Sequence, residues 1–327
     1  MRTVWTMGFV AAAGLSFAFP GFVVFQFTQA AIWALALLGL VLLCGVSGQF
    51  SFAQAALFGM GAYSAALVAA HTNLPVYAAL IVAPLVGYAA GYGLGRVAGR
   101  HDLWTQALIG YALAIAFPQL LRWRLIEQWT GGVQGLYLDL PSAPFDFIDS
   151  DRWLFFLTLG LLAAGVWLAS NIIAGRSGRA LLATRDDDIA AAAQGIDIVA
   201  ARAVAAGLAG GYLALAGCLQ AMQYGYVGPT AYNFALSVQM LFGLVVGGMN
   251  VVAGAIIGGL VLEFLPGLVA GLGKGLSALL YAILLIAAIV AMPNGIAGAL
   301  ARLAGRRPLD PEARRQRRHD VDGRRQQ

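Results

Sequence analysis

The chain has 327 residues, of which 60% are hydrophobic and only 11% are charged. A soluble globular domain is typically about 45–50% apolar and 25% charged. So few charged groups cannot cover the surface of a water-soluble globule of this size. The composition therefore excludes a soluble domain and predicts an integral membrane protein.

The net charge of +5 comes from one C-terminal segment. Residues 302–327 hold nine arginines against four acidic residues, and the basic and acidic groups of the remaining chain cancel. Such a tail, which lacks aromatic stacking partners, is more typical of a cytoplasmic topology signal than of a nucleic-acid site. The two cysteines, Cys44 and Cys218, lie inside apolar runs and indicate neither a disulfide framework nor a metal site.

Ten apolar runs are candidates for membrane-crossing helices, because about 20 apolar residues of helix cross the hydrocarbon core. The first resembles a signal peptide in part, but its apolar run continues to Phe27, which favours a span. The eighth is short enough to be re-entrant. The ten runs are residues 7–27, 30–46, 52–70, 76–95, 103–121, 153–172, 203–223, 235–248, 251–270 and 276–291.

The arginines between these runs predict the orientation, because cytoplasmic loops carry an excess of basic residues. Residues 96–100 and 173–202 are arginine-rich and are expected in the cytoplasm, whereas residues 122–152 are acidic on balance and are expected outside. Ten crossings then place both termini in the cytoplasm, in agreement with Arg2 and the tail. The sequence predicts an all-α polytopic membrane helix bundle, in which glycines spaced four apart allow close helix packing.

Few residues could carry catalysis. The three histidines do not fall in a metal-ligand spacing. Gly273-Lys274 lacks the other glycine and the Ser or Thr of a P-loop, since those positions hold Leu268 and Gly275. The aspartates at 186–188 could bind Mg²⁺ as in membrane-embedded transferases, but the sequence offers no second acidic cluster to hold a diphosphate. We therefore expect no enzyme, no cofactor and no metal site.

One carboxylate lies clearly within an apolar run. Glu263 could line a translocation path, or it could lie near the outer end of its helix and reach water. An ion-coupled carrier needs such groups inside the membrane, where a charge costs about 2.5–3.5 kcal/mol on insertion scales. A single carboxylate gives little support for ion coupling, so we expect the energy for transport to come from another subunit.

A polar interruption separates the second and third apolar runs, where residues 48–54 read GQFSFAQ. The glycine loosens the helix, and Gln49, Ser51 and Gln54 supply hydrogen-bonding groups without a formal charge. Two interpretations stay open. The interruption is either unwound backbone on a solute path, tolerated where protein or a watery cavity meets it, or a cytoplasmic turn in which Gln49 caps a helix.

The stretch between the sixth and seventh runs predicts a short helix. Asp186, Asp187 and Asp188 favour a helix N-terminus through the dipole, the alanines that follow favour helix, and Gly195 suits a C-terminal cap. The small-residue face of such a helix would fit a groove on another protein, or the helix would be an ordinary solvated connector.

Residues 178–197 (GRALLATRDDDIAAAAQGID) closely resemble the coupling loop of the branched-chain amino acid ABC-transporter permeases, on the LivM-like side of that family. Further segments resemble the same family in the same order: residues 48–63, 225–229, 247–255 and 293–298. The sequence differs from the family's common residues at Gln54, Gly228 and Met249-Asn250, where His, Ser and Gly-Ser are common.

The resemblance implies a permease domain at residues 1–300, with a coupling loop at 173–202, followed by an arginine-rich tail at 301–327. It implies a subunit of the bacterial inner membrane that carries a small polar solute inward. Its partners would be a second, homologous permease, two cytoplasmic ATPases and a periplasmic solute-binding protein. The residues expected to couple it to the ATPases are Arg179, Arg185, Asp186, Asp187, Asp188, Gly195 and Asp197.

The solute stays open, and so do two other functional classes. Branched-chain amino acids, urea, amides and aromatic acids all remain candidates, since the binding protein of such systems does most of the selecting. A stand-alone ion-coupled carrier and a membrane-embedded transferase are the alternatives to the permease.

Overall fold

The computed structural model describes residues 20–72, 74–138, 149–270 and 295–298. These residues are almost entirely helical, as the composition predicts. One two-residue ribbon, in which β1 (Leu136–Tyr137) pairs antiparallel with β2 (Tyr226–Val227), was not predicted. The helices are α2 (Gly21–Leu40), α3 (Gln54–His71), α4 (Ala79–Ala98), α5 (Leu103–Leu121), α6 (Glu127–Thr130), α7 (Ser150–Ala174), α8 (Arg176–Asp186), α9 (Asp188–Ala193), α10 (Ile198–Tyr224), α11 (Phe234–Gly247) and α12 (Val252–Ala270), with a π-helical turn η1 (Val41–Val46) and 3-10 turns η2 (Val76–Ala78) and η3 (Pro229–Ala231).

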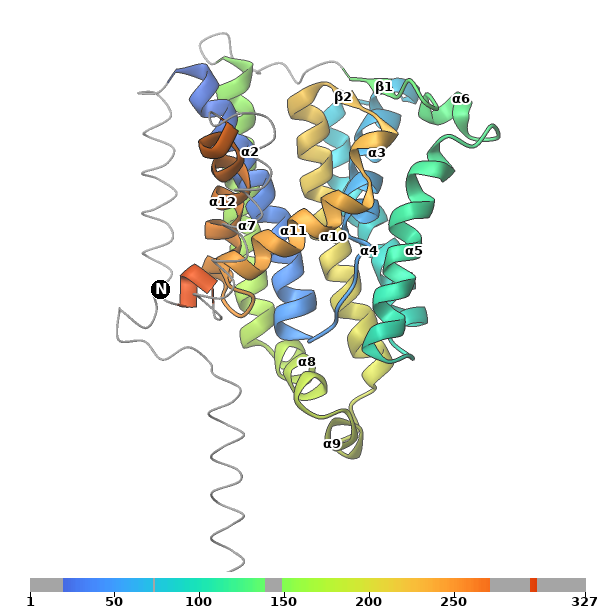
Figure 1. Ribbon diagram of the computed structural model, residues 1–327, viewed down its shortest axis with the longest axis vertical. Coiled ribbons are helices and arrows are strands. Elements are labelled where there is room, and N and C mark those ends of the chain that lie inside the picture. Colours follow the sequence, from blue (N-terminus) through green and yellow to red (C-terminus); the bar gives the residue numbers. More distant parts are fainter. Residues whose placement is uncertain (1–19, 73, 139–148, 271–294, 299–327) are drawn as a thin grey trace, which may run out of the picture.

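Five of the described helices are long and apolar enough to cross a membrane, and α12 is a shorter apolar helix. The predicted eighth run corresponds to α11, whose 14 residues rise only about 21 Å, less than the roughly 30 Å of a hydrocarbon core. In Figure 1, α11 runs obliquely across the bundle. The five are Gly21–Val46, Val76–Ala98, Leu103–Leu121, Ser150–Ala174 and Ile198–Tyr224.

The predicted boundary between the first and second runs is wrong. Helix α2 continues without a break through Thr28 and Gln29, and both side chains are buried inside the bundle. The Thr28 hydroxyl donates to the Val24 carbonyl at 2.8 Å, so the helix itself satisfies this polar group at a position that resembles a loop in the sequence. Most of the first run, the tenth run and the tail lie outside the described residues, and the count of ten spans and the cytoplasmic termini stay predictions.

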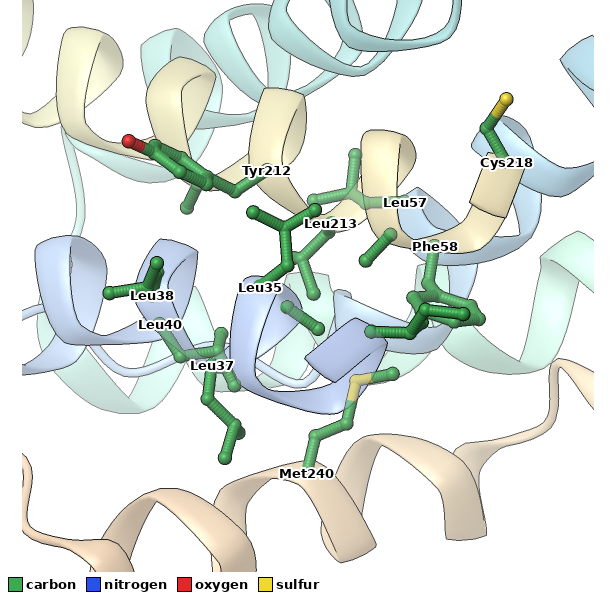
Figure 2. Packing of buried hydrophobic residues seen from close by; sticks show 14 of the residues in the cluster. Leu35, Leu37, Leu38, Leu40, Leu57, Phe58, Tyr212, Leu213, Cys218 and Met240 are labelled. Carbon is green, nitrogen blue, oxygen red and sulfur yellow. The ribbon is translucent and has the colours of Figure 1, made fainter. Parts of the chain in front are cut away.

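Helix α2 lies at the centre of the described bundle, with α7 and α12 on one side and α3, α4, α5 and α10 on the other (Figure 1). Its leucines meet Tyr212 and Leu213 of α10 and Met240 of α11 in the core shown in Figure 2. Burial of such side chains in a membrane adds packing contacts rather than removing surface from water. The stability of this core therefore depends on how closely the helices pack.

Small residues provide that closeness between α4 and α10. A Cβ atom added at Gly91 of α4 would lie 2.3 Å from the carbonyl oxygen of Ala206 in α10, and Gly87 and Gly95 meet α10 in the same way. This confirms that the glycines spaced four apart in α4 form a packing face. The backbones of α4 and α10 are therefore in direct contact along this face.

Candidate functional site

The chain leaves helical geometry between η1 and α3, over residues 47–53, which we name the irregular segment. It rises from the lower end of α2 to the start of α3 (Figure 1). Beside it lies Gly110, near the middle of the 19-residue helix α5: a Cβ atom there would lie 2.5 Å from the Ser51 hydroxyl oxygen and 2.7 Å from the Phe52 nitrogen. Non-helical backbone beside the middle of a membrane helix has to face protein or water, because lipid cannot satisfy its hydrogen bonds.

The side chain of Gln49 holds the lower end of the irregular segment. Its Nε2 donates to the Ser47 hydroxyl at 2.6 Å and to the backbone carbonyl of Arg202, near the start of α10, at 3.0 Å. The residue is only 4% exposed. Gln49 therefore anchors the segment to α10, and both donor hydrogens of its amide are used within the protein.

The upper end of the irregular segment meets α11. Gln54 Nε2 donates to the Ser51 carbonyl at 2.6 Å, and the amide nitrogen of Ala55 donates to the hydroxyl of Ser237 in α11 at 2.9 Å. Gln54 is 1% exposed, and among the described residues its Oε1 has no hydrogen-bond partner. The start of α3 is therefore capped by a serine from a helix that begins 180 residues later in the chain.

A chain of aromatic rings covers the same region. Phe50 and Phe52 meet edge to face at 5.1 Å, Phe52 meets Phe234 of α11 at 5.3 Å, and Phe234 meets Tyr111 of α5 at 4.8 Å. Sequence reasoning missed this cluster, because its rings come from three elements far apart in the sequence, and only the polar residues of the GQFSFAQ stretch were singled out there. The cluster and Ser51 form a half-exposed face of the irregular segment.

Glu263 lies apart from the other candidate path residues. It is half-buried on α12, one turn after Gly259, which packs against Ala30 and Ala34 of α2. The irregular segment follows Ala34 by 13 residues or more, about 20 Å further along the helix axis. The structure therefore brings Gln49, Ser51 and Gln54 together and leaves Glu263 near the opposite end of α2.

Three of the residues predicted to couple the chain to ATPases are helix caps. The Asp187 carboxylate accepts from the backbone of Ile189 and Ala190 at 2.9 and 3.1 Å, so α9 begins within the aspartate cluster. Asp186, predicted at the same helix start, is instead the last residue of α8. Gly195 follows α9 with φ +78°, as its predicted cap role requires. Asp197 caps α10 by accepting from Ala200 at 3.0 Å. Asp187 and Gly195 therefore bound α9, and Asp197 marks the start of α10.

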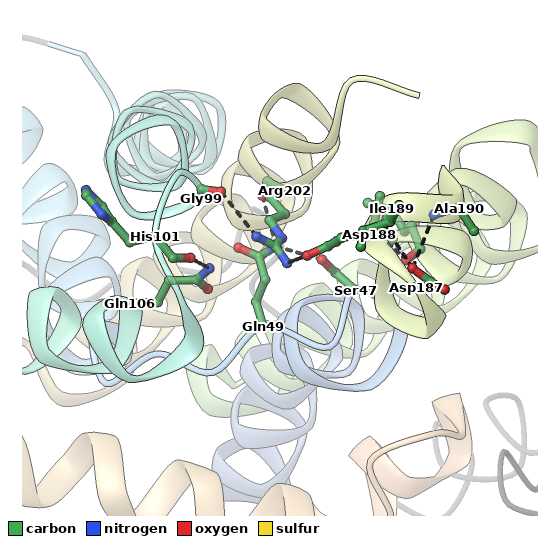
Figure 3. A network of polar contacts seen from close by, with 12 residues as sticks. Ser47, Gln49, Gly99, His101, Gln106, Asp187, Asp188, Ile189, Ala190 and Arg202 are labelled. Atoms are coloured by element: carbon green, nitrogen blue, oxygen red, sulfur yellow. Dashed lines mark hydrogen bonds and ion pairs between the residues drawn. The ribbon is translucent and has the colours of Figure 1, made fainter. Parts of the chain in front are cut away.

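A polar network links α9 to the bundle (Figure 3). Arg202 Nη2 pairs with Asp188 Oδ2 at 2.7 Å, and Arg202 Nη1 donates to the carbonyl of Gly99 at the end of α4 at 3.2 Å. From the sequence, Arg202 is expected only to contribute to the positive charge of a cytoplasmic loop. Nothing nearby in the sequence indicates that it also joins α9 to α4. The network joins the first residue of α9 to the ends of α4 and α10.

The turn between α4 and α5, which accepts this arginine, is itself well held. Gln106 Nε2 donates to the carbonyl of His101 at 2.9 Å, and the Thr105 hydroxyl donates to Asp102 at 2.6 Å. This hydroxyl bond lowers the pKa of the Asp102 carboxyl below its usual value, because it stabilises the charged form. The turn is therefore a fixed anchor for Arg202.

The remaining charged residues of the α8–α9 pair differ in what they contact. Arg179 is exposed and donates to the carbonyl of Ala174 at 3.4 Å, within its own part of the chain. Asp186 ends α8 and is exposed. Arg185 reaches out of α8 and donates to the Gly45 carbonyl and to Asn250. No cluster of three or more metal-ligating side chains occurs in the part of the chain that the structure describes.

Comparison with known protein families decides the identity of this bundle. The family model for the branched-chain amino acid transport system / permease component matches residues 22–301. The chain belongs to this permease family. The match includes the irregular segment, the α8–α9 pair and α11, so the family resemblance of these segments is confirmed, and membership makes the chain a transporter permease component with several apolar helices.

Individual relatives agree with this permease family assignment. The high-affinity branched-chain amino acid transport system permease protein LivM of Salmonella typhimurium is 26% identical over 68% of this chain and 58% of the relative. LivH of the same organism is 25% identical over 83% of this chain and 92% of the relative. The autoinducer 2 import system permease protein LsrC of Escherichia coli is 36% identical over 40% of this chain and 38% of the relative.

The chain spans less than two thirds of the length of the LivM relatives that it matches. No solved structure matches the chain.

Proposed function

We propose that this permease is one subunit of an ABC importer in the bacterial inner membrane, and that it carries a small polar solute inward. The family match over residues 22–301 supports this function most directly. The solute that we favour is a branched-chain or related amino acid, because LivM and LivH are named for that transport. Residues 1–300 would form the permease domain and residues 301–327 a cytoplasmic tail.

The solute path would run along the half-exposed face of the irregular segment. Its backbone lies beside the middle of α5, where it needs protein or water next to it. Ser51 offers a neutral hydroxyl there, whereas the buried Gln49 and Gln54 hold the backbone of the segment in place. A neutral group suits a path that has to release its solute. We therefore propose Ser51 and the aromatic chain as path lining, held from behind by Gln54 and completed by a homologous permease subunit.

The α8–α9 pair supports a docking role. It projects from the lower end of the bundle (Figure 1), and it carries an exposed Ile189 and alanines on a short capped helix. Each of two cytoplasmic ATPases would bind the α8–α9 pair of one permease subunit. A periplasmic binding protein would deliver the solute at the other face of the membrane.

The test is reconstitution of the whole system. The chain is coexpressed with the permease, ATPase and binding-protein genes found beside it, and uptake of labelled leucine, urea and phenylalanine is measured in proteoliposomes. ATP-dependent uptake of one solute that needs the binding protein supports the proposal. Uptake by the isolated chain driven by an ion gradient would instead indicate a carrier, and Mg²⁺-dependent group transfer lost in Asp186→Ala would indicate a transferase.

A further inference from the structure

Arg185 is the residue of the α8–α9 pair that reaches the irregular segment. It is next to last in α8, and its side chain crosses to two other parts of the bundle. Its Nη1 donates to the backbone carbonyl of Gly45 in η1 and to Asn250 Oδ1 at 2.9 Å. Asn250 lies in the turn between α11 and α12, at residues 248–251. One guanidinium group therefore joins α8 to the end of α2 and to the end of α11.

The Gly45 carbonyl is available because of how α2 ends. The helix widens into the π-helical turn η1, and the last backbone bonds run from Ser47 to the Leu42 carbonyl and from Gln49 to the Leu43 carbonyl. The Gly45 carbonyl lies beyond these acceptors, among the carbonyls that a helix end leaves unsatisfied. A guanidinium donor satisfies it and places a positive charge at the C-terminal end of the helix dipole.

Two glycines make room for this contact. A Cβ atom at Gly48 would lie 2.7 Å from Cγ of Arg185, so the aliphatic part of the arginine rests on the irregular segment itself. Gly48 also has φ +70°, which a side chain would strain. At Gly45 the corresponding position is filled by the carbonyl of Met249. The arginine, the irregular segment and the α11–α12 turn are in direct contact.

The second arginine of this region connects different parts. Arg202 binds Asp188 of α9 to the end of α4, and its own backbone carbonyl holds Gln49. The irregular segment is therefore attached at one side to α10, which packs closely on α4, and at the other to α8 through Arg185. A displacement of α8 relative to α10 has to change one of these two attachments.

We propose that Arg185 is the positioning residue that passes a displacement of the α8–α9 pair to the irregular segment and to the α11–α12 turn. The inference rests on the proposed importer function and goes beyond it, because it assigns the internal link to one side chain. Closure of the ATPases would move α8. Arg185 would transmit that movement to the irregular segment and to the α11–α12 turn, which border the solute path.

The experiment compares Arg185→Gln with Arg96→Gln in the complete reconstituted transporter. Both changes remove one arginine, but Arg96 is exposed in the last turn of α4 and lies outside the α8–α9 pair. In Arg185→Gln we expect ATP hydrolysis within about twofold of the unchanged complex and uptake reduced about tenfold, a coupling loss typical of linked sites. Arg96→Gln should retain both activities. A parallel loss of hydrolysis and uptake in Arg185→Gln, or no loss of either, would overturn the inference.

A second measurement separates a link from a merely structural contact. Phe50→Cys places a thiol on the half-exposed face of the irregular segment, and its labelling rate is compared with and without ATP. In the unchanged complex we expect ATP to alter this rate, and in Arg185→Gln we expect hydrolysis to continue while the rate stays constant. An ATP-dependent change that persists in Arg185→Gln contradicts the inference. Failure of the unchanged complex to drive uptake with ATP would instead contradict the proposed function.

Discussion

The side-chain amide of Gln49 donates to the backbone carbonyl of Arg202 at 3.0 Å, across 153 residues of sequence. This bond fixes the start of the irregular segment to the beginning of α10. The guanidinium of the same arginine holds Asp188 at the start of α9. Arg202 thus contacts the proposed solute path through its backbone and the proposed docking helix through its side chain.

Gln49→Ala tests the first of these contacts. The change removes the donors to the part-buried Arg202 carbonyl and to the buried Ser47 hydroxyl, so we expect a loss of about 1–3 kcal/mol in the free energy of unfolding. The measurement is thermal unfolding of the detergent-solubilised protein. Gln128→Ala is the matched control, because Gln128 is exposed in α6. Equal stability of the two variants would show that the Gln49 bonds do not hold the segment.

The second contact is best measured with a double-mutant cycle on Asp188→Asn and Arg202→Gln. The Asp188 side chain is 43% exposed and the Arg202 side chain 15%, so we expect a coupling energy of only about 0.5–1 kcal/mol. The coupling should fall as salt is raised, because partly exposed charges are screened. Additive single-variant effects at low salt would mean that the ion pair contributes nothing to holding α9.

Local patterns were predictable from the sequence because they depend on residues a few positions apart. Asp187 and Gly195 act on backbone groups within four residues, which is why the start and end of α9 follow from the order of aspartates, alanines and glycine. The long apolar runs were predictable for the same reason, since each helix satisfies its own backbone. Thr28 and Gln29 show where this fails, because polar residues inside a buried helix have the same appearance in sequence as a loop.

The contacts that make the candidate site were not predictable. Arg185 meets Gly45 across 140 residues, and Ala55 meets Ser237 across 182. No local rule of spacing or composition links such pairs, since they are set by how α8, α11 and α2 pack. Sequence reasoning therefore found the polar residues of the irregular segment and left open whether Gln49 lines a path or holds a turn, because its bond to the Arg202 carbonyl spans 153 residues.

Gly91 and Gly93 in α4 separate the packing role of glycine from its effect on the helix. A Cβ atom at Gly91 would lie 2.3 Å from the Ala206 carbonyl, whereas at Gly93 it would meet nothing within 4 Å. Gly91→Ala should cost about 1–3 kcal/mol by overpacking the α4–α10 contact. Gly93→Ala should be neutral or stabilise the protein by up to about 1 kcal/mol. Thermal unfolding of both variants decides, and a tolerated Gly91→Ala would exclude the close approach of α4 and α10.

Gly195 is required for its backbone conformation and not for lack of space. It has φ +78°, and a Cβ atom there would meet nothing within 4 Å. Gly195→Val should therefore cost about 1–2 kcal/mol locally, disturb the end of α9 and uncouple ATP hydrolysis from uptake. Gly160→Val in α7 is the control, since its Cβ also meets nothing within 4 Å, but in regular helix. Normal solute-stimulated ATP turnover in the Gly195→Val complex would contradict the prediction.

Ile189 tests the proposed docking of α9. It is 83% exposed and lies one residue after the first residue of α9, beside the exposed Ala190. An apolar side chain this exposed outside the membrane-crossing helices contributes little to the stability of the isolated chain. We expect Ile189→Asp to leave thermal unfolding of the permease unchanged, because no buried contact is lost.

The same change should reduce copurification of the ATPase at least tenfold. A loss of about 1.4 kcal/mol in binding free energy is enough for that effect, and burying a carboxylate in an apolar groove costs more. Ile189→Leu is the matched control, because it preserves the apolar volume and should retain the ATPase. Full recovery of the ATPase with Ile189→Asp would show that α9 does not form the docking surface.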